Sequence, residues 1–457
     1  MTLPLLLDDA LVASDSGFAV RISLPWIRSM PLASIGDLRV AIDGETVAVS
    51  VRIDGREVAP AELRLESGWW FIQDRLELRG RRALAEGPHD VSVSFSLSVP
   101  YLQAGPNGPL TLPFRADRRL AVTRGSELPD GWRLSASAFN WTPAVVRADR
   151  SATDIAVRIV DDGIADTIEI EPGQVWRTFP EPSDAEVDVL RERLAAAGGS
   201  VSIVGASLDD WALPARRRTE DERLAFLVPQ LRAAARVGAI GARVPFGQAG
   251  PELLRRVQPV LEELGIVLFE EIQGQQTPDL PDVAANIELI EELGDPRIRI
   301  LVDSSMLMPS LPPTYLDALR RGGVDEELAS RLEHDWRARE THDAVVSTLR
   351  EGRVPPAVHT LFMDLLVRFG RSEITDLEPL LPLTSGVHLK FWDLDDTGGR
   401  VSRPIADLGA ALRRHGFAGT LTSEWGGHEW LDTDPAEMTR AHLALARRAL
   451  SSVGGGR

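Results

Sequence analysis

The sequence predicts a chain of two parts, an antiparallel β-sandwich over residues 1–128 and a (β/α)8 TIM barrel over residues 129–457. The first part alternates apolar and polar residues with period two, and turn dipeptides separate the runs. In the second part, short apolar runs alternate with amphipathic helical stretches, and eight such runs are the number that closes a barrel. The length of 457 residues is sufficient for two or three domains.

The first part is expected to be all-β. Val91–Val99 alternates apolar and polar residues along its whole length, which is the pattern of a strand with one buried face. Asp43-Gly44 is a turn dipeptide between two further runs of this kind. The other alternating runs are Gly17–Pro25, Leu38–Ile42 and Val47–Ile53. Because no helical pattern of convincing length precedes residue 180, we expect an antiparallel sandwich.

The second part contains eight strand candidates with helical patterns between them. The strands are expected at 135–141, 167–172, 200–207, 240–246, 266–272, 298–304, 386–394 and 419–425, and helices at 184–197, 220–237, 251–265 and 405–416. This alternation predicts parallel strands with helices outside them. Residues from about 308 to 384 exceed what a barrel needs, so we predict a helical insert between strands six and seven, with helices at 313–321, 326–350 and 357–369. Because loops that follow barrel strands form active sites, the insert should border the site.

The composition excludes several classes of protein. A formal net charge of −18 repels nucleic acids and anionic membranes, so we expect neither as a partner. The absence of cysteine excludes disulfides, thiolate nucleophiles and iron–sulfur clusters. No run approaches the roughly 18 to 20 apolar residues of a membrane span. The apolar start of the chain lacks basic residues and is interrupted by Asp8 and Asp9, so we expect a cytoplasmic protein.

Four of the predicted strands end in a side chain that can bind a metal. These are Glu271, Asp303, His388 and Glu424, at the ends of strands five to eight. Because the carboxyl ends of barrel strands meet at one face, we expect the four side chains to lie together. Alternation along the fifth strand places Glu271, rather than Glu270, on the inner face. Three carboxylates and one imidazole favour a hard divalent cation, Mn²⁺ first and Mg²⁺ second, over zinc.

The chain has a single lysine, Lys390, among its 50 basic residues. It follows His388 by two positions, so both side chains share one face of the strand and the ammonium group is expected beside the metal. A compact ammonium group can hydrogen-bond a hydroxyl or a developing enolate, and it can transfer a proton where its pKa falls. We therefore predict that Lys390 is a catalytic residue.

The order of these side chains resembles a known family. Glu, Asp, His-x-Lys and Ser-Glu at the ends of strands five to eight form the pattern of the sugar phosphate isomerase/epimerase barrels, also called xylose isomerase-like barrels. His388-Leu-Lys-Phe-Trp, Thr422-Ser-Glu-Trp and the long insert after Asp303 look most like the catalytic subunit of bacterial C-glycoside deglycosidases. Residues 16–120 resemble the small accessory subunit of those enzymes, through Gly17-Phe-Ala-Val-Arg-Ile, Ile27-Arg-Ser-Met-Pro, Val40-Ala-Ile-Asp-Gly and Trp69-Trp-Phe. The resemblance implies that two separate partners are joined here in one chain.

The resemblance implies a metal-dependent lyase that acts on an oxidised C-glycoside, whose sugar carries a ketone. Removal of the proton beside the ketone gives an enolate, and loss of the aglycone then breaks a carbon–carbon bond, with the metal as Lewis acid. Glu271 and Glu424 are implied as the acid and base that flank the sugar. Two alternatives stay open, namely a keto-sugar isomerase or epimerase that uses the same metal and carboxylate pair, and a non-catalytic carbohydrate-binding protein.

The sequence departs from the family after the fifth strand. Family members commonly carry a histidine two or three residues after the strand-five glutamate, where this chain has Gln273 and Gly274. Glutamine cannot shuttle a proton. The base therefore stays open among the two glutamates, the lysine and a histidine of the insert such as His359.

The expected substrate is a small-molecule glycoside or keto sugar. Tryptophans at the ends of barrel strands can stack on a sugar ring or on a flat aglycone. A homo-oligomer stays among the alternatives for the assembly. The predicted substrate-binding residues are Asn140, Gln273, His359, Trp392, Trp425 and His428.

Overall fold

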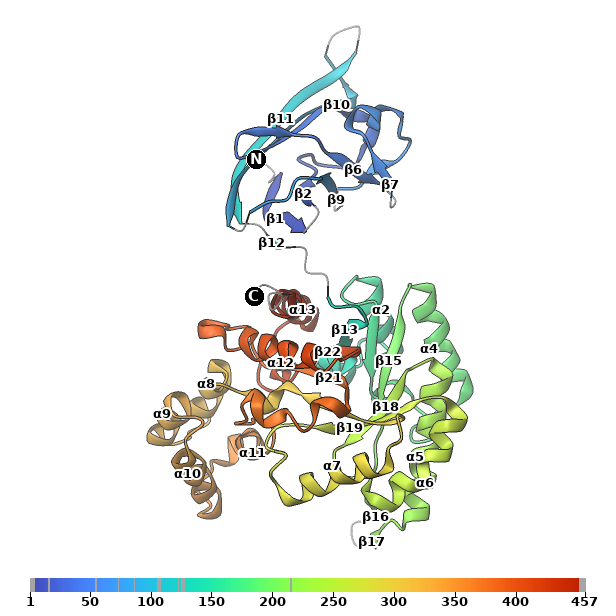
Figure 1. Cartoon of the computed structure of the whole chain (residues 1–457), viewed down its shortest axis with the longest axis vertical. Coiled ribbons are helices and arrows are strands. Elements are labelled where there is room, and N and C mark those ends of the chain that lie inside the picture. The colour runs from blue at the N-terminus through green and yellow to red at the C-terminus, as the bar shows by residue number, and fades with distance from the viewer. Residues whose placement is uncertain are drawn as a thin grey trace. The chain divides into compact units, whose positions relative to one another are not determined.

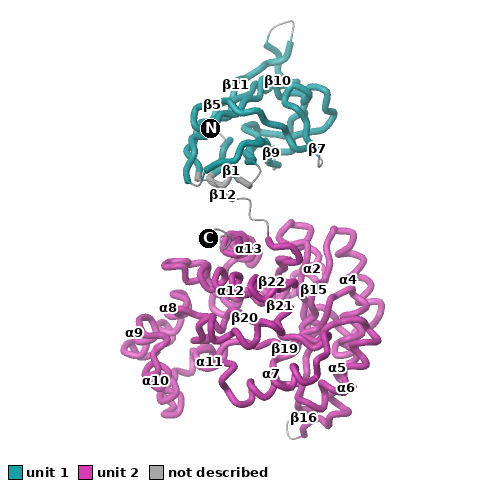
Figure 2. The backbone as a smooth tube through the Cα atoms, viewed as in Figure 1, with its two compact units in different colours: residues 1–127 teal, residues 128–457 magenta. Residues whose placement is uncertain are grey.

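The computed structural model describes residues 5–14, 17–53, 56–72, 74–85, 87–104, 108–121, 123–124, 128–213 and 216–451. The chain divides into two compact units, Met1–Glu127 and Leu128–Arg457, which are coloured separately in Figure 2. Unit 1 is built from β-strands, whereas unit 2 combines strands and helices. Each unit is described by itself below.

Unit 1 consists of two main β-sheets with a shared core. One sheet has the strand order β12-β1-β2-β9-β6-β7, and the other has the order β11-β10-β4-β5. Neighbouring strands are antiparallel, except that β12 runs parallel to β1. The bounds are β1 Leu6–Ser14, β2 Gly17–Ser23, β4 Ile35–Ile42, β5 Glu45–Val47, β6 Ser50–Ile53, β7 Arg56–Val58, β9 Arg75–Gly80, β10 Pro88–Gln103, β11 Pro109–Ala121 and β12 Thr123–Arg124; the short pair β3 Met30–Pro31 and β8 Trp69–Trp70 lies beside them.

The core of unit 1 confirms the period-two prediction. Val20 and Leu78 of one sheet and Val40 and Val93 of the other are buried in a single apolar cluster, as expected where two sheets pack face to face. One predicted strand is wrong. Val47–Ile53 does not form one strand, because the chain leaves the four-stranded sheet after β5 and enters the six-stranded sheet at β6.

Unit 2 is a closed barrel of parallel strands surrounded by helices (Figure 1). The barrel order is β13-β14-β15-β18-β19-β20-β21-β22, which confirms the predicted (β/α)8 fold. The strands are β13 Trp132–Ser137, β14 Thr167–Ile170, β15 Ser200–Gly205, β18 Gly241–Pro245, β19 Val267–Ile272, β20 Ile298–Asp303, β21 Thr384–Phe391 and β22 Gly419–Trp425. The surrounding helices are α1 Thr142–Arg147, α2 Ala152–Asp161, α3 Pro172–Val175, α4 Asp184–Ala196, α5 Glu220–Val237, α6 Gly250–Leu264, α7 Pro281–Leu293, α12 Ser402–Arg414 and α13 Pro435–Ser451; a small hairpin joins β16 Trp211–Leu213 and β17 Arg216–Arg217.

Two local predictions at the start of the barrel are wrong. The first strand ends at Ser137 rather than at residue 141, because the Ser137 side chain accepts a hydrogen bond from the Phe139 amide and begins a short 3-10 helix, Ala138–Trp141. A helix also precedes residue 180, namely α2. The sequence carried a signal for this helix, because Ser151 stands three positions before Asp154, the spacing of a helix cap. In the structure the Ser151 side chain accepts a hydrogen bond from the Asp154 amide.

The insert between β20 and β21 forms a helical layer with its own core. It contains α8 Pro313–Arg321, α9 Glu326–His334, α10 Arg339–Arg350 and α11 His359–Val367, which lie together at one side of the barrel in Figure 1. The single helix expected at 326–350 is broken after His334, and Trp336 in the break is buried against the Phe369 ring and the Arg371 guanidinium. Trp392 of the barrel belongs to the same apolar cluster, so the insert packs against the strand-end face of the barrel.

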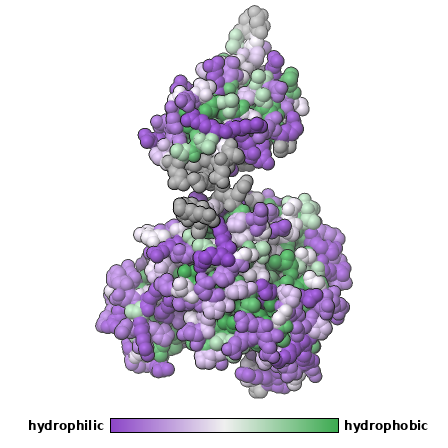
Figure 3. All heavy atoms as spheres, in the orientation of Figure 1, coloured by the Kyte–Doolittle hydropathy of each residue, from purple (hydrophilic) through white to green (hydrophobic). Residues whose placement is uncertain are grey.

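The visible surface of both units is mostly hydrophilic. On the face shown in Figure 3, hydrophilic side chains cover most of both units, and hydrophobic side chains form small groups among them. Within the described ranges, the structure holds no helix that is both long enough and apolar enough to cross a membrane.

Candidate metal centre and active site

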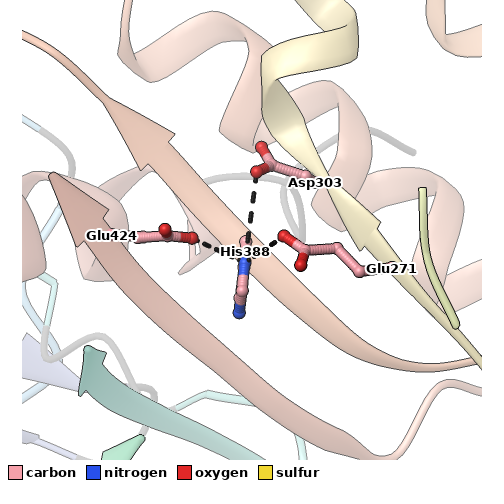
Figure 4. A group of neighbouring side chains, drawn as sticks. All are labelled: Glu271, Asp303, His388 and Glu424. Atoms are coloured by element: carbon pink, nitrogen blue, oxygen red, sulfur yellow. Dashed lines mark hydrogen bonds and ion pairs between the residues drawn. The ribbon is translucent and has the colours of Figure 1, made fainter. Parts of the chain in front are cut away.

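Four acidic and histidine side chains meet inside the barrel near the carboxyl ends of β19 to β22. Glu271, Asp303, His388 and Glu424 each offer one ligand atom, and these atoms all lie within 4.8 Å of one another. Figure 4 shows the three carboxylates pointing toward the imidazole ring. The parallel register produces this meeting, because Asp303 pairs with His388 and the neighbouring strands end at similar heights. All four side chains are buried.

The two ring nitrogens of His388 face different partners. Nδ1 lies 2.6 Å from Oε2 of Glu424, 2.9 Å from Oε1 of Glu271 and 4.0 Å from Oδ2 of Asp303. Nε2 lies 3.0 Å and 3.1 Å from the two carboxylate oxygens of Glu169, which is fully buried at β14. When Nε2 donates its proton to Glu169, the lone pair of Nδ1 is directed at the three carboxylates, which is the arrangement of a histidine that binds a metal.

The donor set fits a divalent cation. Oδ2 of Asp303 is buried without a hydrogen-bond partner among the described residues, and Oε2 of Glu424 has its close contact with Nδ1 of His388, the nitrogen that Asp303 also faces. Burial lowers the pKa of His388, but the surrounding carboxylates outweigh this effect and raise it well above its ordinary value. Such a concentration of negative charge attracts a cation, and an oxygen-rich set with one imidazole suits a hard metal ion.

The charge balance gives the same result. The cluster and the groups linked to it hold five carboxylates against two permanent cations, Arg243 and Lys390, which leaves an excess of three negative charges when all five are ionised and His388 is neutral. A bound dication removes most of this excess. The five carboxylates are Glu169, Glu171, Glu271, Asp303 and Glu424.

Arg243 of β18 ties three glutamates together, and the sequence analysis did not predict this. Its Nη1 donates to Oε2 of Glu271 at 2.8 Å, its Nε donates to Glu169, and its Nη2 donates to Glu171. Thr167-Ile-Glu-Ile-Glu carried the signal for two of these groups, since Glu169 and Glu171 alternate with apolar residues and therefore share one face of the strand end.

Lys390 forms a buried ion pair with Glu424. Its Nζ donates to Oε1 of Glu424 at 2.8 Å and lies 5.4 Å from the centre of the Phe139 ring. Burial lowers the pKa of Lys390, but the charges of Glu424 and Asp303 outweigh it and raise that pKa above its ordinary value. The surrounding carboxylates thus favour the charged ammonium form of Lys390. Lys390 is placed to donate hydrogen bonds as a fixed cation.

The amino-acid sequence is similar to that of several bacterial proteins with known names. The chain is 31% identical over 303 residues to the C-glycoside deglycosidase alpha subunit of Arthrobacter globiformis, a match that covers 65% of this chain and 86% of that protein. The chain belongs to the C-glycoside deglycosidase family. No family model matches it. As a member of the deglycosidase family, the chain is a sugar-modifying enzyme.

The chain also contains a part that is similar to beta subunits. It is 32% identical over 123 residues to the 3'-dehydrocarminate deglycosidase beta subunit of a Microbacterium species, which covers 26% of this chain and 92% of that protein, and such matches cover the N-terminal part. Two parts that are named elsewhere as separate subunits are thus joined in one polypeptide. Solved structures with similarity include D-psicose 3-epimerase (14% identity, TM-score 0.43, 70% of this chain and 99% of that chain) and 3-keto-D-glucoside 4-epimerase from E. coli (15% identity, TM-score 0.41, 69% and 99%).

Two of the predicted substrate-binding residues make their hydrogen bonds within the chain. Asn140 is fully buried, and its amide group donates to Thr439 and to the Ser423 carbonyl while it accepts from the Trp425 amide. Trp425 is also buried, and its indole N–H donates to the carbonyl of Trp392. The structure therefore gives Asn140 and Trp425 a part in fixing the end of β22 and its neighbours.

Three other predicted residues, His428, His359 and Gln273, are half-buried or exposed. His428 is half-buried between the rings of Phe139 and Trp425, and its Nε2 has no hydrogen-bond partner among the described residues. His359 begins α11 and is exposed, so it lies on the insert and apart from the buried cluster. Gln273 follows β19 and is half-buried, and its backbone N–H donates to the side-chain oxygen of Gln276.

A mostly apolar cavity has Lys390 among its lining residues but none of the four candidate ligands. Trp392 follows β21 and contributes to the wall of the cavity, and Arg400 adds a charge at its side. Its lining residues are Ser304, Met308, Pro312, Lys390, Phe391, Trp392, Asp393, Arg400, Val401, Pro404 and Ile405.

Proposed function

We propose that this chain is a metal-dependent carbon–carbon lyase that releases the aglycone from a C-glycoside whose sugar has been oxidised to a ketone. The observation that carries the proposal is the buried cluster of three carboxylates and one imidazole with Lys390 fixed beside it, in a member of the deglycosidase family. The curated relatives named as C-glycoside deglycosidases support the substrate class.

The roles of the residues follow from their contacts. Glu271, Asp303, His388 and Glu424 would hold the metal, for which we propose Mn²⁺ because the donors are mainly oxygen. When bound, a divalent cation supplies Lewis acidity at the ketone and thereby eases removal of the neighbouring proton. Lys390 adds a fixed positive charge that stabilises the developing enolate.

The surroundings of the cluster support binding of a keto sugar with an aromatic aglycone. The mostly apolar cavity that Lys390 and Trp392 help to line offers a surface for a flat ring. We expect Glu271 and Glu424 to flank the sugar, and both have pKa values held below the ordinary range by neighbouring cations that outweigh burial.

A comparison of three compounds tests the proposal. Purified protein with Mn²⁺ is incubated with a keto C-glycoside, with its unoxidised parent glycoside and with a keto sugar that lacks an aglycone, and free aglycone is measured by chromatography. We expect aglycone from the keto C-glycoside alone, because only the ketone acidifies the neighbouring carbon. Conversion of the plain keto sugar into an isomer or epimer, with no aglycone from the glycoside, would favour the isomerase alternative and contradict the proposal. Binding without any product would favour a carbohydrate-binding protein.

A further inference from the structure

Glu171 is a carboxylate at the strand-end face of the barrel that does not belong to the four candidate metal ligands. It directly follows β14, and Nη2 of Arg243 donates to its carboxylate. Nη1 of the same guanidinium donates to Glu271 at 2.8 Å. Both carboxylates are therefore bound to one planar group, which places Glu171 beside the cluster without making it one of the four candidate ligands.

Glu171 is also the most exposed of the charged side chains in this network. Its side chain is 22% exposed, compared with 0% for Glu169, 5% for Glu271 and 7% for Glu424. Since parallel strands open toward the active-site face at their carboxyl ends, a group one step beyond β14 faces the space that a substrate enters. A sugar at the metal cluster would thus meet Glu171 rather than Glu169.

The other polar groups of the site have other partners. Glu271 and Glu424 are candidate metal ligands, and the Lys390 ammonium group donates to Glu424. Burial raises the pKa of Glu171 to about 7, and the charges of Glu169, Glu424 and Glu271 add to this rise, whereas Arg243 opposes it. Glu171 can therefore both accept and release a proton near neutrality.

The neighbouring strand makes room for this carboxylate. A Cβ atom added at Gly205, the last residue of β15, would overlap both carboxylate oxygens of Glu171. Gly205 does not have the positive φ that favours glycine. The reason the structure gives for a glycine here is therefore that any larger residue would displace the Glu171 side chain.

We propose that Glu171 is the proton-transfer residue of the site, taking the proton from the carbon beside the sugar ketone and giving it to the departing aglycone. This inference rests on the proposed lyase function. In the first step the C–H bond breaks, its electron pair forms a carbon–carbon double bond, the carbonyl pair moves to oxygen, and the carboxylate becomes a carboxylic acid. In the second step the carbonyl re-forms, the double bond shifts to the carbon that carried the aglycone, and the broken C–C pair leaves with the aglycone carbon, which takes the proton back from Glu171. The products are an unsaturated keto sugar and the protonated aglycone, and no further reactant is needed.

The test separates proton transfer from metal binding. Manganese-loaded protein is incubated with a keto C-glycoside, free aglycone is measured by chromatography, and exchange of the proton beside the ketone is followed by NMR in D₂O. For Glu171→Gln we expect both rates to fall by at least about 100-fold, as for loss of a general acid–base group, with metal content by mass spectrometry and thermal stability close to wild type. The matched control Glu181→Gln, an exposed glutamate ten residues on, should leave both rates unchanged.

Gly205→Ala offers a second variant that keeps the carboxylate but displaces it. We expect a loss of rate in Gly205→Ala and no additional loss when it is combined with Glu171→Gln, because the glycine acts only through Glu171. Wild-type rates in Glu171→Gln would overturn this inference and leave the lyase proposal standing. A loss of metal from Glu171→Gln that accounts for its lower rate would also overturn it. Absence of both exchange and aglycone in the wild type would overturn the lyase proposal itself.

Discussion

Replacing Glu169 with glutamine tests how the chain orients the metal-binding nitrogen of His388. Both oxygens of Glu169 lie within 3.1 Å of Nε2, and the carboxylate also accepts from Arg243, all within a fully buried environment. Glutamine offers one acceptor oxygen in place of two and removes the negative charge that favours the Nε2–H form of the ring. Loss of such a partner weakens metal binding by about 10- to 100-fold, or about 1.4 to 2.7 kcal/mol.

The effect can be converted into a melting temperature. With Mn²⁺ at about 1,000 times its dissociation constant, binding stabilises the wild type by about 4.1 kcal/mol, whereas a 100-fold weaker variant keeps about 1.4 kcal/mol. Unit 2 has about 330 residues, so its unfolding entropy is about 0.7 kcal/mol per kelvin. The rise in melting temperature on adding metal should therefore fall from about 6 °C to about 2 °C.

Calorimetry measures both quantities. Metal is removed with a chelator, Mn²⁺ is titrated back to obtain the dissociation constant, and scans with and without Mn²⁺ give the shift in melting temperature. Glu171→Gln is the matched comparison, since it removes a carboxylate from the same strand end and the same arginine without contacting His388, and its loss of affinity should be clearly smaller. Wild-type affinity and a full 6 °C shift in Glu169→Gln would refute the idea that Glu169 fixes the ligand histidine.

Three further predictions concern other parts of unit 2. Lys390→Arg should lower turnover at least about tenfold with metal retained, which corresponds to about 1.4 kcal/mol in the transition state. The reason is that a planar guanidinium cannot take the place of the ammonium group beside Glu424. Steady-state kinetics and metal analysis check this, and unchanged turnover would contradict it. Burial lowers the pKa of His442 to about 3, so its neutral form is favoured in the folded state and its contribution to stability is lost as pH falls below about 6.5. Between pH 6.5 and 5, urea denaturation of the metal-free wild type should therefore show about 2 kcal/mol more loss of stability than His442→Asn, and parallel pH profiles would disprove the assignment. Gly274 has a φ of 57°, and an added Cβ would overlap the Val367 carbonyl of the insert, so Gly274→Ala should destabilise the contact between insert and barrel by about 2 kcal/mol or more; limited proteolysis of the insert measures this, and wild-type resistance would count against it.

The four candidate metal ligands could be predicted from the sequence because the barrel itself brings them together. Each of them ends an apolar strand, and the closure of parallel strands places these ends around one axis. The choice of Glu271 follows from alternation alone, and Glu271 is indeed the member of the pair that reaches the cluster, while Glu270 bonds to Asn286 instead. Their function as ligands stays a prediction until metal is measured.

The second layer of the site could not be predicted in the same way. Arg243 meets Glu169 and Glu171 across more than 70 residues of sequence, and a lone arginine in a predicted strand does not reveal which face it occupies or what it touches. The alternating pair of glutamates at β14 did carry a signal, since both side chains share one face of the strand end. The role of Asn140 also depends on tertiary contacts, because its side-chain amide forms hydrogen bonds with residues distant in the sequence.

The insert shows another limit of pattern reasoning. The amphipathic pattern over 326–350 favours one long helix, but the buried Trp336 turns the chain between α9 and α10 to reach the Phe369 ring. Burial of an indole against partners from the far side of the insert outweighs the local preference for helix. Such a contact between residues distant in sequence is not encoded in the local pattern.

The most direct test of the account is metal-dependent release of aglycone. Protein stripped of metal by a chelator, and the same protein reloaded with Mn²⁺, are incubated with a keto C-glycoside, and free aglycone is measured by chromatography. The account predicts aglycone from the reloaded protein, none from the stripped protein, and none from a reloaded His388→Asn variant. Equal release with and without metal, or a reloaded enzyme that only isomerises or epimerises the sugar, would contradict it.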